Sequence, residues 1–189
     1  MAQTHFGFEP VDEADKAARF IQICDAFGLP LIFLQDVPGF MVGSKVEHAG
    51  IIRHGAKMLH AMSAATVPKL TVVVRKGYGA GYYVMAGRAY EPDLLVAWPT
   101  AEISVMGAEG MVGIASKKLF GDAEPSVEMK AKVTEAIRAN IDIYRVAGWG
   151  LVDDVIDPRD TRRALAWGLT VSARKRVERP EKKRGILPV

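Results

Sequence analysis

Short continuous apolar runs along the chain are separated by stretches in which apolar residues recur every three or four positions. Residues 31–35 and 70–74 are such runs, and they are typical of strands buried on both faces of a parallel sheet. Between and before them, helical spacing predicts one helix from Asp12 to Gly28 and another from Ser44 to Pro68. A strand, a helix and a second strand in this order predict a right-handed β-α-β unit.

The second of these helices carries two finer predictions. Ser44 and Glu47 have the spacing of a capping box, which would satisfy the first N–H groups of the helix. Its buried face is expected to be narrow and rich in small residues. The residues on that face are Ala49, Ile52, Ala56, Leu59 and Ser63.

The remainder of the chain repeats the same steps of strand, turn and helix. Two short strands are predicted at 93–98 and 102–106, and a glycine-rich helix start follows at 107–113. A long amphipathic helix is expected at 126–147, and then an edge element at 152–156. Asp157 and Pro158 start a last helix, whose apolar side is Ala164, Leu165, Trp167, Leu169 and Val171. No linker divides the chain, which predicts one α/β domain that binds ligands at the carboxyl ends of its strands.

A glycine-rich turn at residues 75–81 joins the strand at 70–74 to a predicted helix at 82–87. Glycine allows positive φ and lets a ligand approach the backbone closely. The first N–H groups of a helix lack internal partners, and the helix dipole makes that end partly positive. The N–H groups around Gly79, Ala80 and Gly81 can therefore bind a developing oxyanion, although tight packing of a helix on a sheet would also explain such glycines.

Composition and charge exclude several classes of function. The 189 residues are 49% hydrophobic and carry a net charge of +3, of which residues 174–184 contribute +5. The body of the chain has no basic face interleaved with aromatics, so nucleic-acid binding is not expected. The basic tail is read as a solvated helix end, with contact to an anionic partner as the alternative. The single cysteine, Cys24, and the absence of a leader or membrane-spanning run predict a cytoplasmic protein.

Several ionisable residues are candidates for catalytic groups or metal ligands. Asp36 precedes a Pro-Gly turn, where aspartate more often bonds the amides of its own loop. Glu102 and Glu109 are possible acid or base residues, but both fit surface or capping positions. The three histidines spaced six residues apart, at positions 48, 54 and 60, lie on different sides of one helix. They cannot share one metal, so we expect no metal site.

Five sequence motifs resemble, in order, the C-terminal half of the carboxyltransferase (beta) subunit of biotin-dependent acyl-CoA carboxylases, of the propionyl-CoA and methylcrotonyl-CoA type. The resemblance runs from about residue 15 onward, and residues 179–188 are similar to the end of that subunit. The motifs are Asp-Val-Pro-Gly-Phe at 36–40, Gly-Ile-Ile-Arg-His-Gly-Ala-Lys at 50–57, Ala-Thr-Val-Pro-Lys at 65–69, Arg-Lys-Gly-Tyr-Gly-Ala-Gly at 75–81 and Trp-Pro-Thr-Ala-Glu-Ile-Ser-Val-Met-Gly at 98–107.

The resemblance implies a crotonase-like fold, a superhelix of repeated ββα units in a single domain. It implies transfer of a carboxyl group from carboxybiotin to the α-carbon of an acyl-CoA, with this half holding biotin. The N–H groups of Ala80 and Gly81 would form the oxyanion hole, although the family often has Gly-Gly-Ala at 79–81. Gly79, Tyr78 and Phe40 would help bind biotin. Tyr83 stands where propionyl-type members have a small acidic residue that selects the acyl chain, which leaves the substrate open.

Residues 1–189 would thus be the C-terminal carboxyltransferase domain, without the N-terminal half that binds acyl-CoA. The expected partners are that half, a biotin carrier with its biotin carboxylase, and further copies of the chain. Three alternatives stay open. These are a biotin-dependent acyl-CoA decarboxylase running the transfer in reverse, a non-catalytic module that docks a biotin carrier, and a crotonase-type hydratase or isomerase that depends on a glutamate.

Overall fold

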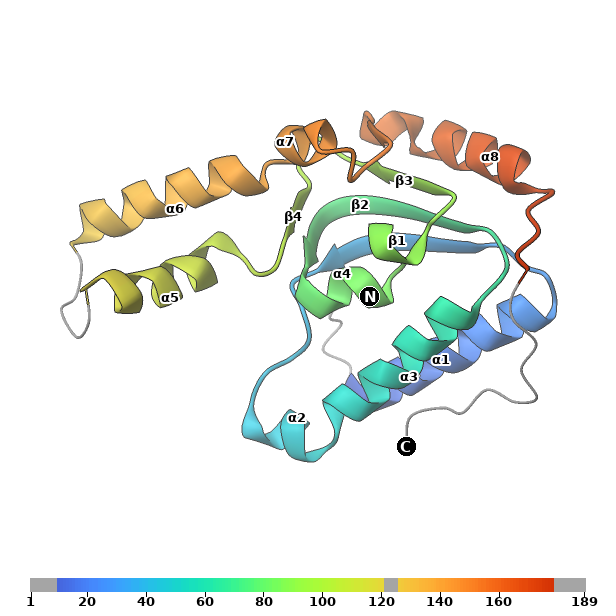
Figure 1. The fold of residues 1–189 in the computed structure, drawn as a ribbon, viewed down its shortest axis with the longest axis horizontal. Helices are drawn as coiled ribbons and strands as arrows, with labels where there is room; N and C mark the ends of the chain where they lie inside the picture. The colour runs from blue at the N-terminus through green and yellow to red at the C-terminus, as the bar shows by residue number, and fades with distance from the viewer. Residues whose placement is uncertain (1–9, 121–125, 179–189) are drawn as a thin grey trace.

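A parallel β-sheet organises the computed structural model, which describes residues 10–120 and 126–178 (Figure 1). Its strands lie in the order β1-β2-β3-β5, and β4 pairs with the far end of β2. All pairings between these strands are parallel. The strands are β1 (Leu31–Val37), β2 (Lys69–Tyr78), β3 (Leu94–Ala97), β4 (Glu102–Ser104) and β5 (Asp154–Val155).

Helices cover both faces of this sheet, and two of them extend away from it. Figure 1 shows α1 and α3 side by side below the sheet and α8 above it, while α5 and α6 project together to one side. In the described ranges, no helix is both long and apolar enough to cross a membrane. The helices are α1 (Pro10–Ala26), α2 (Ser44–His48), α3 (Ile51–Ala64), α4 (Gly79–Val84), α5 (Ala108–Phe120), α6 (Val127–Ile141), α7 (Ile143–Gly148) and α8 (Thr161–Ser172), with short 3₁₀ turns at Arg88–Tyr90 and Pro158–Asp160.

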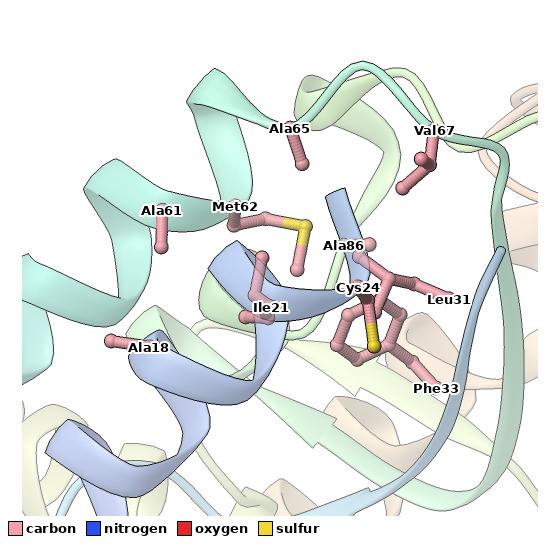
Figure 2. Close-up of a cluster of buried hydrophobic side chains, with 10 residues drawn as sticks. All are labelled: Ala18, Ile21, Cys24, Leu31, Phe33, Ala61, Met62, Ala65, Val67 and Ala86. Atoms are coloured by element: carbon pink, nitrogen blue, oxygen red, sulfur yellow. The ribbon is translucent and has the colours of Figure 1, made fainter. Parts of the chain in front are cut away.

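The strand register divides the core into two layers. Phe33 of β1 aligns with Thr71 of β2, which aligns with Leu95 of β3, so these side chains share the face below the sheet. On that face a buried cluster joins α1, α3 and β1 (Figure 2). Its members are Ala18, Ile21, Cys24, Leu31, Phe33, Ala61, Met62, Ala65, Val67 and Ala86. Cys24 is buried there as a core residue, as predicted.

The opposite face of the sheet packs against α8. Leu70, Val72, Leu94 and Val96 form its buried layer together with Ile156. Gly168 lets the helix approach closely, because a Cβ there would lie 2.7 Å from Leu70 Cδ2. The predicted β-α-β unit is therefore confirmed and extended into a sheet with helices on both sides.

The predicted helix over 44–68 is wrong in its detail. It is two helices, α2 and α3, separated at Gly50, whose φ of 86° is left-handed and ends the regular hydrogen bonding. Ser44 lies inside α2, and no side chain caps that helix, so the capping box does not form. The buried positions of α3 are Ile51, Gly55, Ala61 and Met62.

The face of α3 predicted from Ala49, Ile52, Ala56, Leu59 and Ser63 is therefore wrong, and Ile52 is 63% exposed. Restarting the helix at Ile51 turns the neighbouring apolar positions toward α1 instead. The long helix predicted at 126–147 is likewise divided. It begins after Ser126 as expected, and the Ser126 hydroxyl caps it by accepting a hydrogen bond from the Met129 N–H. At the other end, Asp142 ends α6 and caps the separate helix α7.

Two buried faces predicted from apolar runs are only partly buried. In β1, Leu31, Phe33 and Gln35 are buried, whereas Ile32 and Leu34 are 46% and 56% exposed. The strand is therefore not buried on both faces, because α8 covers β2 and β3 but not β1. On α8, Ala164, Leu165 and Leu169 pack inward while Trp167 and Val171 are exposed. The terminal motif at 179–188 lies outside the described residues.

Candidate functional site

The glycine-rich turn places the start of α4 at the carboxyl end of β2. Tyr78 precedes the helix in an extended conformation, and Gly79 follows it with a φ of 55°. Few residues other than glycine adopt that conformation without strain. A Cβ at Gly79 would also lie 2.9 Å from the carbonyl oxygen of Val105, so the loop after β4 closes over the turn.

The N–H groups of Ala80 and Gly81 lie in the first turn of α4. Ala80 is exposed and Gly81 is buried. No side chain caps the helix, and none of the turn, loop and cap hydrogen bonds in the described part of the chain starts from either N–H. Groups at this position have no partner four residues earlier in the helix. They are donors that an anionic oxygen could accept.

An apolar cavity of about 250 Å³ lies beside this helix start. It is bounded by α1, α3, α4 and the loop after β1, and Gly39, Phe40 and Gly81 contribute to its wall. Close packing fixes this arrangement. A Cβ at Gly81 would lie 2.6 Å from Val37 Cγ2, and one at Gly55 of α3 would lie 2.4 Å from the Phe40 ring.

Of the six predicted site residues, the structure thus brings Gly81 and Phe40 together at one cavity. Ala80 precedes Gly81 in the chain, and Gly79, with its positive φ, sets the direction of the turn. Tyr78 and Tyr83 do not line the cavity. Tyr83 is 46% exposed, and its ring stacks edge-on against Tyr82 and Tyr90.

Tyr78 points away from the cavity, toward β4. Its ring is buried, and its hydroxyl donates a hydrogen bond to the Glu102 carboxylate. Burial is the main cause that raises the pKa of Tyr78, and the neighbouring Glu102 carboxylate raises it further. Tyr78 therefore stays a neutral donor, and Glu102 serves to tie β4 to the glycine-rich turn.

Asp36 links the ends of β1 and β2. Its carboxylate accepts hydrogen bonds from both Nε and Nη2 of Arg75, the shortest of 2.7 Å from Nη2, and a further bond of 3.3 Å from the Lys76 N–H. The Arg75 guanidinium is the main cause that lowers the pKa of Asp36. The prediction that Asp36 bonds the amides of its own loop is therefore wrong, because its partners lie on the neighbouring strand β2.

Sequence reasoning missed Gln35, whose side chain holds the end of α4 to β1. This side chain is fully buried, and its Nε2 donates to the Met85 carbonyl oxygen at 2.7 Å and to that of Tyr82 at 3.3 Å. A buried glutamine in an apolar strand needs such partners, because an unpaired amide in the core is costly. The polar residue at the end of the run 31–35 was the available signal.

The remaining candidates act outside this cavity. Glu109 forms an exposed ion pair of 2.5 Å with Arg138, which joins α5 to α6. His54 contacts Asp15 at 2.8 Å and so links α3 to α1. Across the described residues, no three side chains of the metal-binding types come together as a possible metal site.

Comparison with known proteins identifies the family of the chain and several of its relatives. Residues 3–187 match the carboxyl transferase domain family. The chain is 50% identical over 179 residues to the methylmalonyl-CoA carboxyltransferase 12S subunit of Propionibacterium freudenreichii subsp. shermanii, covering 94% of this chain and 34% of that one. It is 44% identical over 188 residues to the methylmalonyl-CoA decarboxylase subunit alpha of Propionigenium modestum, covering 99% and 36%.

Among solved structures, the transcarboxylase 12S hexamer with methylmalonyl-coenzyme A bound superposes with a TM-score of 0.89 at 49% identity. That likeness covers 95% of this chain and 35% of the 12S chain. The chain thus spans about a third of the length of the relatives it matches.

Proposed function

Because the chain belongs to the carboxyl transferase domain family, we propose that it forms the biotin-holding part of an enzyme that transfers a carboxyl group between biotin and an acyl-CoA. The observation that carries the proposal is the start of α4, where two adjacent N–H donors open beside an apolar cavity. Such an enzyme would also need an acyl-CoA-binding part, and the relatives have about two thirds of their length outside the match to supply one.

The cavity and the two donors suit biotin. The walls of the cavity are mainly apolar, which fits the hydrocarbon and thioether ring system of biotin. The start of α4 offers N–H donors for the ureido oxygen. Ala80 and Gly81 would hold that oxygen through their N–H groups, and Phe40 would pack against the ring. Gly79 shapes the turn, and Tyr78 would act by holding the turn to β4 through Glu102.

When bound, carboxylated biotin supplies the carboxyl group and, once that group has left, the base that takes the α-proton. The residues of this chain then have one main task, which is to stabilise negative charge on the ureido oxygen. Preorganised N–H donors do so without rearrangement, and removing one donor of this kind typically costs about 2.7–4 kcal/mol of transition-state stabilisation. Such a reaction needs no Ser-His-Asp set or carboxylate pair in this domain.

We infer that the substrate is an acyl-CoA, and the residue at position 83 leaves the identity of its acyl chain open. Tyr83 occupies the position expected to select the acyl chain, and its ring is 46% exposed beside Tyr90. A large neutral ring there differs in size and charge from a small acidic side chain. The biotin carrier, the acyl-CoA-binding part and further copies of the chain are the proposed partners, in keeping with the hexamer formed by the 12S relative.

A second candidate is the reverse reaction, in which a carboxylated acyl-CoA loses its carboxyl group to biotin. The similarity to a methylmalonyl-CoA decarboxylase subunit over nearly the whole chain favours it. Both directions use the same oxyanion donors, so the residues of this domain do not distinguish them. Proteins outside this chain would set the direction.

Carboxyl transfer from labelled methylmalonyl-CoA to free biotin tests the proposal. The protein is purified from its source with everything bound to it, and label is measured on biotin. We expect transfer to be retained in Glu102→Gln and Glu109→Gln variants of the assembly, because neither carboxylate serves as a base and glutamine at position 102 keeps an oxygen that accepts the Tyr78 hydrogen bond. An assembly that binds a biotinylated carrier but moves no label would instead support the docking module. Hydration or isomerisation of an unsaturated acyl-CoA that is lost with either glutamate would support the hydratase or isomerase.

A further inference from the structure

The carboxyl end of α4 is held by two buried polar side chains from the sheet. Gln35 of β1 donates from Nε2 to the carbonyl oxygens of Met85, at 2.7 Å, and Tyr82, at 3.3 Å. Thr71 of β2 donates from Oγ1 to the Ala86 carbonyl oxygen at 2.9 Å. Gln35 and Thr71 are both fully buried. Carbonyl groups in the last turn of a helix and just after it have no partner within the helix, so these side chains supply bonds that α4 cannot make by itself.

The chain leaves α4 through a strained turn. Ala86 has a φ of 56°, which residues with a side chain rarely adopt, and it is fully buried in the cluster of Figure 2. Gly87 follows in close contact with Tyr82, because a Cβ there would lie 2.5 Å from Tyr82 Cε1. The Tyr82 hydroxyl accepts a bond of 2.9 Å from the Arg88 N–H. A strained residue persists only where its surroundings hold it, and the bond from Thr71 to Ala86 is one of these restraints.

α4 is too short to set its own orientation. It has six residues, so its ends lie about 9 Å apart. A helix of that length is not stable alone in water, and its position depends on the groups that it contacts. At the amino end, Gly79 and Gly81 pack closely against Val105 and Val37. With that end packed in this way, a loss of the bonds at the carboxyl end would tilt the helix and turn its first N–H groups away from the cavity.

The Gln35 amide contributes its bonds at a cost. Its Oε1 is buried and has no hydrogen-bond partner among the described residues. An unpaired buried acceptor destabilises a fold, so an apolar side chain of the same length would suit packing under β1 better. Packing alone therefore does not account for a glutamine at this position. The two bonds from Nε2 to the end of α4 do account for it.

We propose that Gln35 and Thr71 are positioning residues, which hold α4 in the orientation that directs the N–H groups of Ala80 and Gly81 at the cavity. This role rests on the proposed function, and it concerns how the donors are held rather than which reaction they serve. Gln35 has the larger part, because replacing it removes two bonds whereas replacing Thr71 removes one. A reacting group that is misplaced by about 1 Å can cost about a hundredfold in rate.

Kinetics of the assembled enzyme test the role of Gln35. Gln35→Met keeps the length of the side chain and removes its donor. For transfer of label from methylmalonyl-CoA to free biotin, we expect kcat to fall about tenfold or more while KM for methylmalonyl-CoA stays within about twofold, because the donors face biotin. Thr71→Val should show the same split with a smaller loss. An unchanged kcat in Gln35→Met would overturn the proposal.

Ser172 supplies a matched control for these substitutions. Its hydroxyl is buried and donates to the Gly168 carbonyl oxygen at 2.6 Å, within α8 on the other face of the sheet. Ser172→Ala should therefore leave kcat within about twofold. Rates are compared well below the melting temperature of every variant, so that a loss of folded protein does not enter. A loss in Ser172→Ala equal to that in Gln35→Met would overturn the positioning role.

A carboxyl group at position 35 gives a readout that packing alone would not change. In Gln35→Glu the neutral acid can still donate to the Met85 carbonyl oxygen, whereas the ionised carboxylate would face carbonyl oxygens and repel α4. Burial raises the pKa of such a carboxyl group above its ordinary value. The ratio of transfer by Gln35→Glu to transfer by the unchanged protein should therefore rise as pH falls from about 9 to about 6. A ratio that stays constant or falls over this range would contradict the positioning role.

A structure of the Gln35→Met assembly separates this role from the proposed function. We expect the backbone nitrogens of Ala80 and Gly81 to shift by about 1 Å or more relative to Val37 and Phe40. Nitrogens that keep their places would overturn the positioning role, whatever the enzyme transfers. If the unchanged assembly moves no label, the proposed function fails, and the shift or its absence in this structure alone decides how α4 is held.

Discussion

Two glycine-rich turns lead from a strand into a helix in this molecule, and they differ in how the helix start is used. At α4, Gly79 has positive φ, and a Cβ added at Gly81 would lie 2.6 Å from Val37 Cγ2, which is too close for any side chain. At α5, Gly107 needs no positive φ, and a Cβ at Gly110 would lie 3.5 Å from Met106 Sδ, which is ordinary contact. The two turns look alike in sequence, but only the first requires glycine.

The two helix starts also differ in what occupies their N–H groups. Glu109 lies in the first turn of α5, and its own N–H is the main cause that lowers its pKa, with Arg138 adding to the effect. The first turn of α4 contains no acidic residue and no side-chain cap. A carboxylate of the chain thus uses the α5 start, whereas no side chain caps the α4 start. Close packing and a missing cap are the two features on which the proposed binding role of the α4 turn depends.

The largest effect is expected from proline at the second residue of each helix. Ala80→Pro removes an N–H that the helix itself does not use, so α4 should form while one oxyanion donor is lost. Carboxyl transfer by the assembled enzyme should fall about a hundredfold or more. Glu109→Pro makes the matched change in α5 and should leave transfer within about threefold. An Ala80→Pro enzyme that is folded and fully active would contradict the role of α4.

Replacing glycine with alanine should change the free energy of unfolding in opposite directions at the two turns. Gly81→Ala forces Val37 and the backbone near Gly39 to move, and overpacking of this kind costs about 1–3 kcal/mol. Gly110→Ala meets only ordinary contact and should stabilise α5 by about 0.5–1 kcal/mol. Urea unfolding of both variants measures the difference. Equal stability changes would mean that the tight contact at Gly81 relaxes without cost.

The bond that ties the first turn to β4 should have a smaller effect. Tyr78→Phe leaves the Glu102 carboxylate without its buried donor, and a hydrogen bond to a charged group contributes about 1.5 kcal/mol or more. Transfer should also decline, since the turn loses its attachment. Tyr144 on α7 is 59% exposed, so Tyr144→Phe serves as the control and should change the free energy of unfolding by less than about 0.5 kcal/mol. Equal losses in both variants would argue against this attachment.

The smallest expected effect is on how the stability of the fold depends on pH. The pKa of Asp36 is lower in the folded chain, mainly because of Arg75, so the folded state binds protons less readily than the unfolded state. Its contribution to stability is present above the unfolded pKa of about 3.9 and is lost as pH falls through the folded value. Between pH 7 and pH 3, melting temperature should fall less in Asp36→Asn than in the unchanged protein. Glu109→Gln removes the exposed ion pair with Arg138, and it should reduce the pH dependence of the melting temperature less than Asp36→Asn does.

Much of the fold could be predicted from the sequence because its strands are apolar and its helices periodic. The parallel β-α-β unit and the helix start at Ser126 are confirmed, and likeness to the 12S structure confirms the crotonase-like fold. The errors arise where tertiary structure decides. The left-handed Gly50 divides one predicted helix, Asp142 divides another, and β1 has an exposed face that its sequence does not distinguish from a buried one.

The candidate site was predictable in its backbone but not in its side chains. Glycines between a strand and a helix indicated donors around Gly79, Ala80 and Gly81, and the family resemblance narrowed them to the N–H groups of Ala80 and Gly81. The sequence could not show that Tyr78 turns toward Glu102, because these two residues lie on different strands and are 24 positions apart in the chain. The support that Gln35 gives to α4 spans 50 residues and was equally hidden.

A structure of the native assembly with a biotinylated carrier bound would test the central claim most directly. The distances to measure join the ureido oxygen of biotin to the backbone nitrogens of Ala80 and Gly81. We predict that both are hydrogen-bond distances, about 2.9 Å, with the ring against Phe40. A ureido oxygen held by other donors, with both nitrogens more than about 3.5 Å away, would contradict the assignment of this domain as the biotin-holding part.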